Sequence, residues 1–404
     1  MVGDSLSPMS DAPLTHDRTL AEAAWAQAFG DLPVEHGLAL REGAAWRHFP
    51  ATDPARHRPL LSVADLDAFL ATDAAREPRV SMADSRRRGS AAVPLDSYLR
   101  DDGRVDLPGL FAAFDKGATL VVSRFHELHA PLMRFCRGLE QVFLHGVQAN
   151  IYLTPPGAQG FRVHYDTHDV LVLQVTGEKR WRLWDGQPVP RPTWRTPWPG
   201  NIEPEGEATT ITLRPGDTLY VPRGVLHDAA AQDGEDPSLH VTVGLLDPSF
   251  ATVLRLAVDL LEAQEPGLRE SFPTWRLAEG PERLADLARP LAARLAEPAA
   301  LERAALALLD RLAAERPALL GRGLFVPAPE PGTKLILAPG VLHALVPEAG
   351  GGASLRWAGA PMVLSTTEAG WFALLADGAS PAELGDGALA FCDDLLRRGL
   401  LVRA

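Results

Sequence analysis

Two cysteines in 404 residues leave little scope for disulfide or thiolate chemistry. Cys136 and Cys392 lie far apart and within apolar helical patterns, so we expect packing residues and exclude a disulfide framework or a thiolate metal cluster. No stretch approaches the roughly 20 apolar residues of a membrane-spanning helix. The first residues, MVGDSLSPMSDAPL, lack the basic start and apolar run of a secretory signal. We therefore expect a cytoplasmic protein without a membrane partner.

Basic residues are also outnumbered, with 39 Lys and Arg against 52 Asp and Glu and a net charge of −13. This balance argues against bulk binding of nucleic acid. Lysine is rare: Lys116, Lys179 and Lys334 are the three in the chain, a bias that a genome rich in G and C explains most simply. The 46% hydrophobic share is ordinary for a globular protein, and the length predicts two or three domains.

The middle of the chain has the pattern of a β-barrel or jelly roll. Short β-rich segments are separated by turns such as Thr176-Gly-Glu and Pro215-Gly-Asp, a spacing typical of such folds. The predicted strands are 118–123, 149–153, 169–175, 179–185, 209–213, 218–221 and 238–244. The proline-rich stretch Gly186–Glu207 is predicted to be irregular.

Helical patterns flank this region. Ser62 is a predicted N-cap for a helix over 63–70, and Pro131–Val142 is amphipathic. After Asp247, one helix face carries apolar residues from Val253 to Leu261, and a second helix carries a seam of Leu301, Ala305, Leu308 and Leu312. Capping boxes at Ser365-Thr-Thr-Glu368 and Ser380-Pro-Ala-Glu383, a helix over 388–398 and a strand after Gly399 outline a winged helix.

The chemistry is concentrated in His164-Tyr-Asp166 and in His227. Positions two apart in a strand face the same way, so His164 and Asp166 can present an imidazole and a carboxylate together. His227 follows the turn Pro222-Arg-Gly, which can deliver it to a barrel mouth. Two histidines and one carboxylate leave open positions on the metal, as in non-heme Fe(II) oxygenases. We therefore predict that these three residues bind iron.

Such an iron needs a co-substrate that supplies electrons, usually 2-oxoglutarate, whose distal carboxylate requires a cation inside the barrel. Lys179 opens the strand after the one that follows His164. In a chain that otherwise almost always uses arginine, a lysine at this position suggests a specific role. The residues alone leave open a lysine that merely extends from a strand edge to solvent.

Three segments resemble the JmjC-type ribosomal protein oxygenases, which are cupin-fold enzymes that hydroxylate ribosomal protein side chains. They are 149–160 (ANIYLTPPGAQG), 164–183 (HYDTHDVLVLQVTGEKRWRL) and 215–227 (PGDTLYVPRGVLH). The resemblance implies a mixed fold with a double-stranded β-helix, followed by a helical region and a C-terminal winged helix. The implied domains are 1–48 (tail and helix), 49–250 (JmjC oxygenase domain), 251–317 (helical dimerisation region) and 318–404 (winged-helix-like domain).

The resemblance also assigns roles to single residues. His164, Asp166 and His227 would bind Fe(II), Lys179 would hold 2-oxoglutarate, and Asn150 and Tyr152 would line the co-substrate and substrate pocket. Where Gly244 stands, family members often have serine or threonine. Thr242, on the same strand face, could supply the hydrogen bond that Gly244 lacks.

Other conspicuous residues receive structural interpretations. His168 as a fourth ligand would close an open coordination position, so we expect it at the pocket edge or surface. His343 repeats the Gly-Val-Leu-His pattern of His227 without a preceding His-X-Asp. Trp194, Trp198, Arg191 and Arg195 could grip a peptide or cover the barrel. Residues 351–404 hold four arginines and six acidic residues, so we expect no DNA binding.

The sequence thus predicts a 2-oxoglutarate- and Fe(II)-dependent dioxygenase that hydroxylates a side chain, at a β-carbon, of a ribosomal protein or another protein. Its cofactors would be Fe(II), 2-oxoglutarate and O₂, and the resemblance implies a homodimer. Two alternatives are a hydroxylase that tailors peptide natural products and a non-enzymatic metal-sensing cupin whose winged helix is regulatory.

Overall fold

The computed structural model describes residues 14–15, 18–43, 45–87, 91–196, 202–271, 273–316, 325–348, 351–357 and 361–404. They divide into two compact units. The N-terminal unit comprises residues 18–246, and the C-terminal unit combines residues 14–15 with the described residues from 247 onward. In the parts described, no helix is both long and apolar enough to cross a bilayer.

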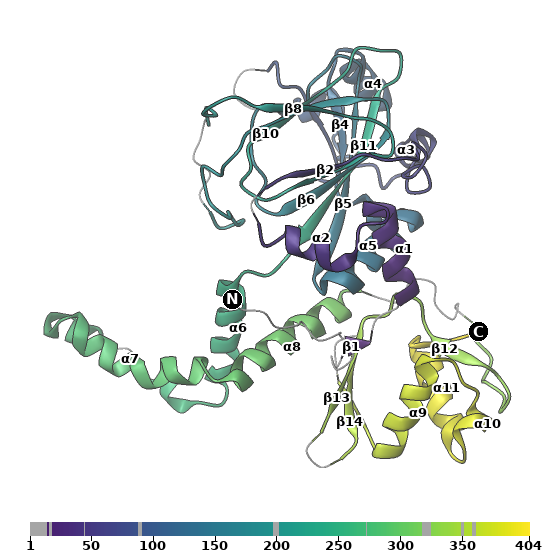
Figure 1. Ribbon diagram of the computed structural model, residues 1–404, viewed down its shortest axis with the longest axis vertical. Helices are drawn as coiled ribbons and strands as arrows, with labels where there is room; N and C mark the ends of the chain where they lie inside the picture. Colours follow the sequence, from purple (N-terminus) through teal and green to yellow (C-terminus); the bar gives the residue numbers. More distant parts are fainter. Residues whose placement is uncertain are drawn as a thin grey trace. The chain divides into compact units, whose positions relative to one another are not determined.

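Two antiparallel sheets form the centre of the N-terminal unit (Figure 1). The larger sheet has the order β2-β9-β6-β11-β5-β4-β3, and the smaller has the order β10-β7-β8. Their bounds are β2 Arg47–Phe49, β3 Val80–Ala83, β4 Thr119–Val122, β5 Gly146–Thr154, β6 Asp169–Thr176, β7 Lys179–Leu183, β8 Thr209–Leu213, β9 Thr218–Val221, β10 His227–Ala231 and β11 Ser238–Leu246. Two such sheets agree with the β-barrel or jelly roll that the turn spacing predicts.

Burial along two consecutive strands explains how the sheets pack and where they leave a cavity. In β6, every residue from Asp169 to Val175 is buried, as expected for a central strand covered on both faces. In β7, burial alternates, so that Lys179, Trp181 and Leu183 face inward while the arginines between them face solvent. A two-residue turn therefore fixes which side chains of β7 enter the barrel.

Helices cover one side of the larger sheet. Their bounds are α1 Arg18–Phe29, α2 Val34–Leu40, α3 Val63–Leu70, α4 Leu107–Asp115 and α5 Ala130–Phe143, with 3₁₀ turns at Leu95–Ser97 and Phe125–Glu127. Helices α1 and α5 pack closely because Gly138 has no side chain: a Cβ there would lie 2.4 Å from the Ala24 Cβ. The predicted N-cap of α3 is confirmed: Ser62 caps the helix, and the Ser62 and Asp65 side chains each accept a backbone N–H of the other, which makes a capping box.

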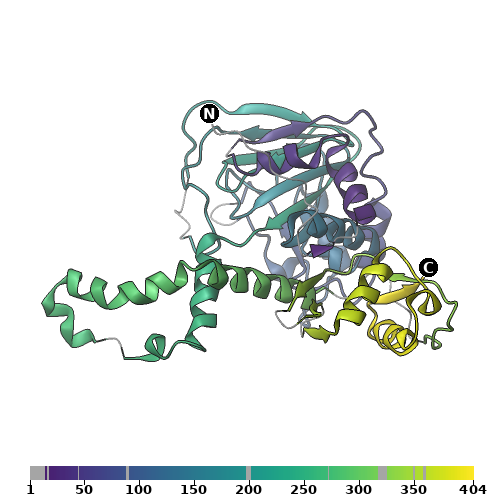
Figure 2. The same ribbon diagram turned by 60° about the horizontal axis from the view of Figure 1, so that its bottom comes forward.

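The C-terminal unit contains helices and two small sheets (Figure 2). Its helices are α6 Phe250–Glu262, α7 Pro281–Leu295, α8 Pro298–Ala314, α9 Thr366–Ala376, α10 Pro381–Leu384 and α11 Ala388–Arg398, with 3₁₀ turns at Pro266–Arg269 and Thr274–Glu279. Its strands are β1 Leu14–Thr15, β12 Leu335–Leu337, β13 His343–Pro347, β14 Ala353–Arg356, β15 Met362–Leu364 and β16 Leu401–Arg403. Both predicted capping boxes, at Ser365 and Ser380, are present.

Two sequence-based expectations need correction. His164 does not lie in a strand ladder; it makes a single antiparallel bridge to His227, and β10, which begins at His227, was not predicted. The seam on α8 is only partly a packing face. Leu308 and Leu312 pack in small apolar clusters, whereas Leu301 and Ala305 are exposed and Ala300 and Ala304 are buried instead.

Candidate metal centre

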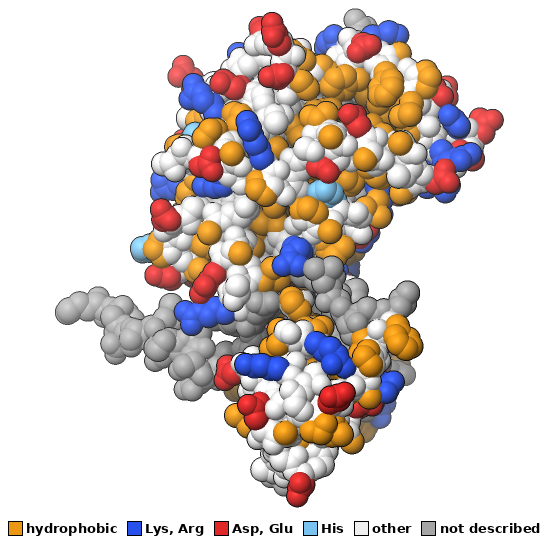
Figure 3. Space-filling view, turned by 90° about the vertical axis from the view of Figure 1, so that its right-hand side faces the viewer, with side chains coloured by type: hydrophobic (Ala, Val, Ile, Leu, Met, Phe, Trp, Pro, Cys, Tyr) orange, Lys and Arg blue, Asp and Glu red, His pale blue; other side chains and the backbone are white. Residues whose placement is uncertain are grey.

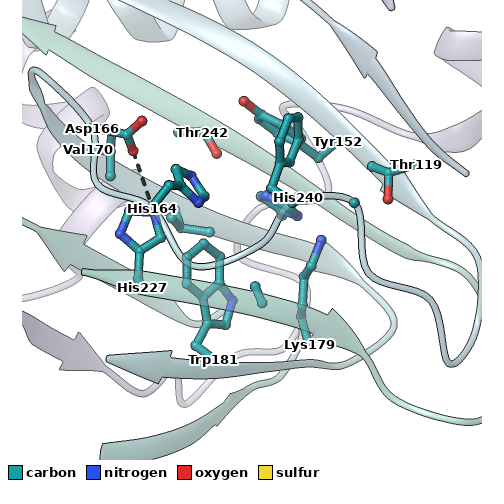
Figure 4. Close-up of a pocket in the computed structure, with 14 residues that line it drawn as sticks. Thr119, Tyr152, His164, Asp166, Val170, Lys179, Trp181, His227, His240 and Thr242 are labelled. Carbon is teal, nitrogen blue, oxygen red and sulfur yellow. Dashed lines mark ion pairs between the residues drawn. The ribbon is translucent and has the colours of Figure 1, made fainter. Parts of the chain in front are cut away.

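Three potential metal ligands converge at one end of the barrel. His164 and Asp166 come from the segment that leads into β6, and His227 is the first residue of β10. One ligand atom from each can be chosen so that all lie within 4.8 Å of one another. Figure 4 shows the three side chains pointing toward a common centre, with the Asp166 carboxylate 3.7 Å from His227 Nε2. The geometry fits one metal ion held by two imidazoles and one carboxylate.

Both imidazoles are oriented by backbone carbonyls. His227 Nδ1 lies 2.9 Å from the Val225 carbonyl oxygen, and His164 Nδ1 lies 2.7 Å from that of Arg162. A carbonyl oxygen only accepts, so each Nδ1 must carry the proton. In the neutral form of each ring, Nε2 is then available as a ligand atom, the arrangement usual for metal-binding histidines.

The environment of His227 favours its neutral form. The side chain is buried, and burial together with nearby His164 lowers its pKa to about 4, although Asp166 opposes this shift. A neutral imidazole at physiological pH is ready to bind a cation without first losing a proton.

Asp169 links the segment that carries His164 and Asp166 to the turn before His227. Its carboxylate accepts the Arg223 backbone N–H at 3.0 Å and the Tyr220 hydroxyl at 2.9 Å. The Gly224 N–H also donates to the Asp166 carbonyl at 3.0 Å. The turn before His227 is thereby held against the segment that carries His164 and Asp166.

A cavity of about 220 Å³ opens beside the three ligands. Its wall includes Lys179 and Trp181 from β7, Tyr152 from β5, and His240 and Thr242 from β11 (Figure 4). The remaining lining residues are Thr119, Gly160, Phe161, Val170, Val172 and Ala229, besides the three ligands themselves. The predicted residues Lys179, Tyr152 and Thr242 thus share one cavity with the triad.

Lys179 is a buried cation without an acidic partner among the residues described. Its Nζ donates to Thr154 Oγ1 at 2.9 Å, and Thr154 in turn lies 3.1 Å from Thr119 Oγ1. The side chain is 4% exposed, and burial lowers its pKa to about 7. A charged group is rarely buried unless it is paired, so this lysine has the chemistry of an anion-binding residue.

Two further polar atoms in the wall lack protein partners. In the described part of the chain, neither Trp181 Nε1 nor His240 Nδ1 has a hydrogen-bond partner, although both atoms are buried. His240 stacks on Tyr152 with ring centroids 4.9 Å apart. Its pKa is lowered well below the usual value by burial and by Lys179, so it is neutral. Buried polar groups are normally satisfied, so these two atoms indicate a polar ligand in the cavity. The sequence placed His240 on the same strand face as Thr242 but assigned no role to it or to Trp181; the alternation of their strands was the signal for both.

Asn150 does not take its predicted place in the cavity wall. Its Oδ1 accepts the backbone N–H of Arg124, which has a left-handed φ of 55°. The side chain therefore stabilises the turn after β4. Sharing a strand face with Tyr152 was insufficient, because a local backbone donor binds the amide.

The remaining conspicuous residues lie as follows. His343 is buried in the C-terminal unit against Phe372, and both cysteines are buried. The segment that starts at Gly186 is anchored on the turn before His227, since Gln187 donates to the Arg223 carbonyl at 2.8 Å. Trp194 is 77% exposed with the Arg195 guanidinium over its ring. Trp198 lies outside the described residues.

Comparison with known proteins identifies this region, because residues 121–253 match the JmjC domain family. These residues form a JmjC domain. The chain is similar to Ribosomal oxygenase 2 of Bos taurus, with 36% identity over 213 residues, which are 49% of this chain and 45% of that protein. It is also similar to the bifunctional lysine-specific demethylase and histidyl-hydroxylase NO66 of Dictyostelium discoideum, with 37% identity over 182 residues, 43% of this chain and 35% of that protein. The chain spans less than half the length of these curated relatives.

A solved structure has the same fold over most of the chain. The ribosomal oxygenase YcfD from Escherichia coli, in complex with cobalt and 2-oxoglutarate, matches with a TM-score of 0.52 and 16% identity. The match covers 92% of this chain and 98% of YcfD. At 16% identity, the likeness shows that the two proteins share a fold and shows nothing further.

The residues present fit an iron ion and a dicarboxylate. The triad offers nitrogen and oxygen ligands of the types that Fe(II) accepts. Lys179, Trp181 Nε1 and His240 Nδ1 offer a cation and two unsatisfied polar atoms along the same wall.

Proposed function

We propose that this protein is an Fe(II)- and 2-oxoglutarate-dependent oxygenase that hydroxylates a ribosomal protein side chain at a β-carbon. The observation that carries the proposal is Lys179, a buried lysine that faces the triad's cavity without a carboxylate partner in the described structure. A dicarboxylate with one end at the metal and the other at Lys179 accounts both for the place of this lysine in the triad's cavity and for its lack of a carboxylate partner among the described residues. The similarity of the JmjC domain to ribosomal oxygenases and histidyl-hydroxylases supports the choice of substrate.

In this proposal the triad holds the metal and the wall holds the co-substrate. His164, Asp166 and His227 would bind Fe(II), and Lys179 would pair with a carboxylate of 2-oxoglutarate. Once bound, the iron and 2-oxoglutarate supply the oxygen-activating chemistry that a C–H hydroxylation needs. The chain's own contribution is to orient the ligands, exclude water with apolar wall residues such as Val170 and Val172, and position the substrate.

Thr154 holds Lys179 in place before the co-substrate binds. Its hydroxyl accepts from Nζ, so the ammonium group is fixed at the end of the cavity. Binding of a carboxylate would raise the pKa of Lys179 from about 7 toward the usual value of lysine, because an opposite charge favours the charged form.

The test is hydroxylation of intact ribosomes from the source organism, read by mass spectrometry as the gain of one oxygen on a ribosomal protein. We expect the product with wild-type protein, Fe(II), 2-oxoglutarate and O₂, and none with His227→Ala. Turnover that survives in His227→Ala would refute the triad. Hydroxylation of a peptide natural product in place of ribosomal proteins would support the tailoring enzyme, the first alternative from the sequence.

We also propose that the C-terminal unit forms a homodimer through α6–α8 and ends in a winged-helix-like domain. Large apolar side chains are exposed on this region, including Phe250, Leu254, Trp275 and Leu301. On the face seen in Figure 3, acidic and basic side chains of the C-terminal unit lie mixed, so no basic stripe for DNA is visible there. Light scattering of the whole protein would give twice the monomer mass, and Leu301→Asp should lower the measured mass toward that of the monomer. A ribosomal substrate also implies a cytoplasmic location.

A further inference from the structure

Gly244 lacks a side chain on the face of β11 that carries the cavity residues His240 and Thr242. His240, Thr242 and Gly244 share one face of this strand, and the first two line the cavity. Gly244 pairs with Val170 of β6, which also lines the cavity (Figure 4). The strand face therefore continues past Thr242 toward the metal end of the barrel, where it reaches a residue without a side chain.

The imidazole of His168 occupies the space that a side chain at position 244 would fill. A Cβ built on Gly244 would lie 2.5 Å from His168 Nε2 and 2.6 Å from its Cδ2. No Cβ tolerates such contacts, so this position of the ring requires glycine at 244. The two residues are far apart in sequence and meet next to the lining residues Val170 and Thr242, at the edge of the cavity.

His168 is also free to bind something else. No hydrogen bond joins its ring nitrogens to the residues described, and its side chain is partly exposed. It lies two residues after Asp166, but it is not part of the group of possible metal ligands. A neutral imidazole can donate one hydrogen bond and accept another. A serine or threonine hydroxyl at position 244 could also do both, but its shorter side chain would hold the hydroxyl closer to the backbone of β11.

We infer that His168, seated on Gly244, is a specificity-determining residue that hydrogen-bonds a polar group of the protein substrate beside the carbon to be hydroxylated. This inference rests on the proposed function. It goes beyond that function because it assigns substrate contact to a loop residue in place of the strand residue at 244. Thr242 then keeps its own place in the wall.

The kinetic test uses His168→Ala, Gly244→Ser and the double variant, with ribosomes from the source organism as the substrate. Serine at 244 should displace the ring without unfolding the barrel, because the atoms that it meets are the outer atoms of a side chain that can rotate away. We expect each single variant to raise the KM for ribosomes about 10-fold, the loss expected for one hydrogen bond. The double variant should recover part of this loss, since serine then fills the emptied space.

A binding test reads the same contact without turnover. Anaerobic protein loaded with Mn(II) and 2-oxoglutarate is treated with diethylpyrocarbonate, and modification of each histidine is read by mass spectrometry. Ribosomes should protect His168 from modification. They should not protect His36, an exposed histidine on α2, whose replacement His36→Ala is the matched control for the kinetics.

The outcomes separate this inference from the proposed function. If ribosomes are hydroxylated but His168 stays as reactive as His36, or His168→Ala keeps the wild-type KM, only the inference is wrong. If the wild-type protein forms no complex with Fe(II) and 2-oxoglutarate, the proposed function fails and the inference with it. If that complex forms but no ribosomal protein is hydroxylated, the substrate assignment and this inference are both overturned.

Discussion

Lys179 combines a functional requirement with a cost to stability. Burying its ammonium group among Thr154, Trp181 and His240 removes water without supplying a carboxylate in the part of the chain described. We predict that Lys179→Met stabilises the apoprotein at pH 7 by a few kcal/mol, about 1.4 kcal/mol for each unit of the pKa shift at most. Urea unfolding measures this, and Lys116→Met, at an exposed lysine in the same unit, should leave stability unchanged.

The same shift predicts a pH dependence. Burial lowers the pKa of Lys179 from 10.5 to about 7. Between these values the unfolded chain holds the proton that the folded protein has released, so the free energy of unfolding of the apoprotein rises with pH. Below about pH 7 both states are protonated and the destabilisation is fully present. The rise should be smaller in Lys179→Met; an identical pH profile in the variant would show that the lysine is not desolvated.

Trp181 gives a second prediction at the residue scale. Trp181→Phe keeps a ring in the wall but removes the unpartnered Nε1 donor. The affinity for 2-oxoglutarate should fall about 10-fold, the effect of one hydrogen bond to a charged group, while metal affinity stays unchanged. Isothermal titration of the apoprotein with Mn(II) measures the metal affinity, and titration of the Mn(II)-loaded protein with 2-oxoglutarate measures the affinity for the co-substrate. Equal affinity for 2-oxoglutarate in the two proteins would assign Nε1 to another ligand.

Single residues differed in how far the sequence could place them. The residues alone left open whether Lys179 faces solvent; in the structure, the alternation along β7 turns Lys179 and Trp181, two apart, inward. Asn150 obeyed the same alternation, yet its side chain binds the Arg124 backbone. The contact between His168 and Gly244 joins the segment before β6 to the neighbouring strand β11, which is remote in sequence, and no local pattern encodes such a contact.

At the scale of elements, Asp169 controls how two segments meet. It links the start of β6 to the turn between β9 and β10 through Arg223 and Tyr220. Asp169→Ala should lower metal affinity 10- to 100-fold without removing a ligand, as is typical of residues that orient metal ligands. Tyr220→Phe removes one of the two hydrogen bonds and should have a smaller effect. Competition with a chelator measures the affinities, and a wild-type value for Asp169→Ala would contradict this role.

The elements themselves were largely predictable. Gly and Pro turns separate β6, β7, β8, β9 and β11, and serine capping boxes mark α3, α9 and α10, so these signals are local. Strand β10, with the sequence HDAAA, has no strong β-formers. It forms because its backbone pairs with β7 from His227↔Leu183 to Ala231↔Lys179. Its pairing partner, which is remote in sequence, determines its structure.

At the scale of the molecule, the metal centre and the cavity lie entirely within the N-terminal unit. We predict that residues 18–246 alone bind Fe(II) and 2-oxoglutarate with affinities close to those of the whole chain. Calorimetry on the shortened and full proteins measures this. A folded fragment that binds neither ligand would mean that the C-terminal unit contributes to the site.

The central claim is that the triad and Lys179 hold iron and 2-oxoglutarate together. The most direct measurement is an anaerobic titration of the apoprotein with Fe(II) and 2-oxoglutarate, followed by the visible metal-to-ligand charge-transfer band. We expect the band in the wild-type protein only when both are present, a weaker band in Lys179→Ala, and a wild-type band in Lys116→Ala. Iron that binds while 2-oxoglutarate produces no band would contradict the account.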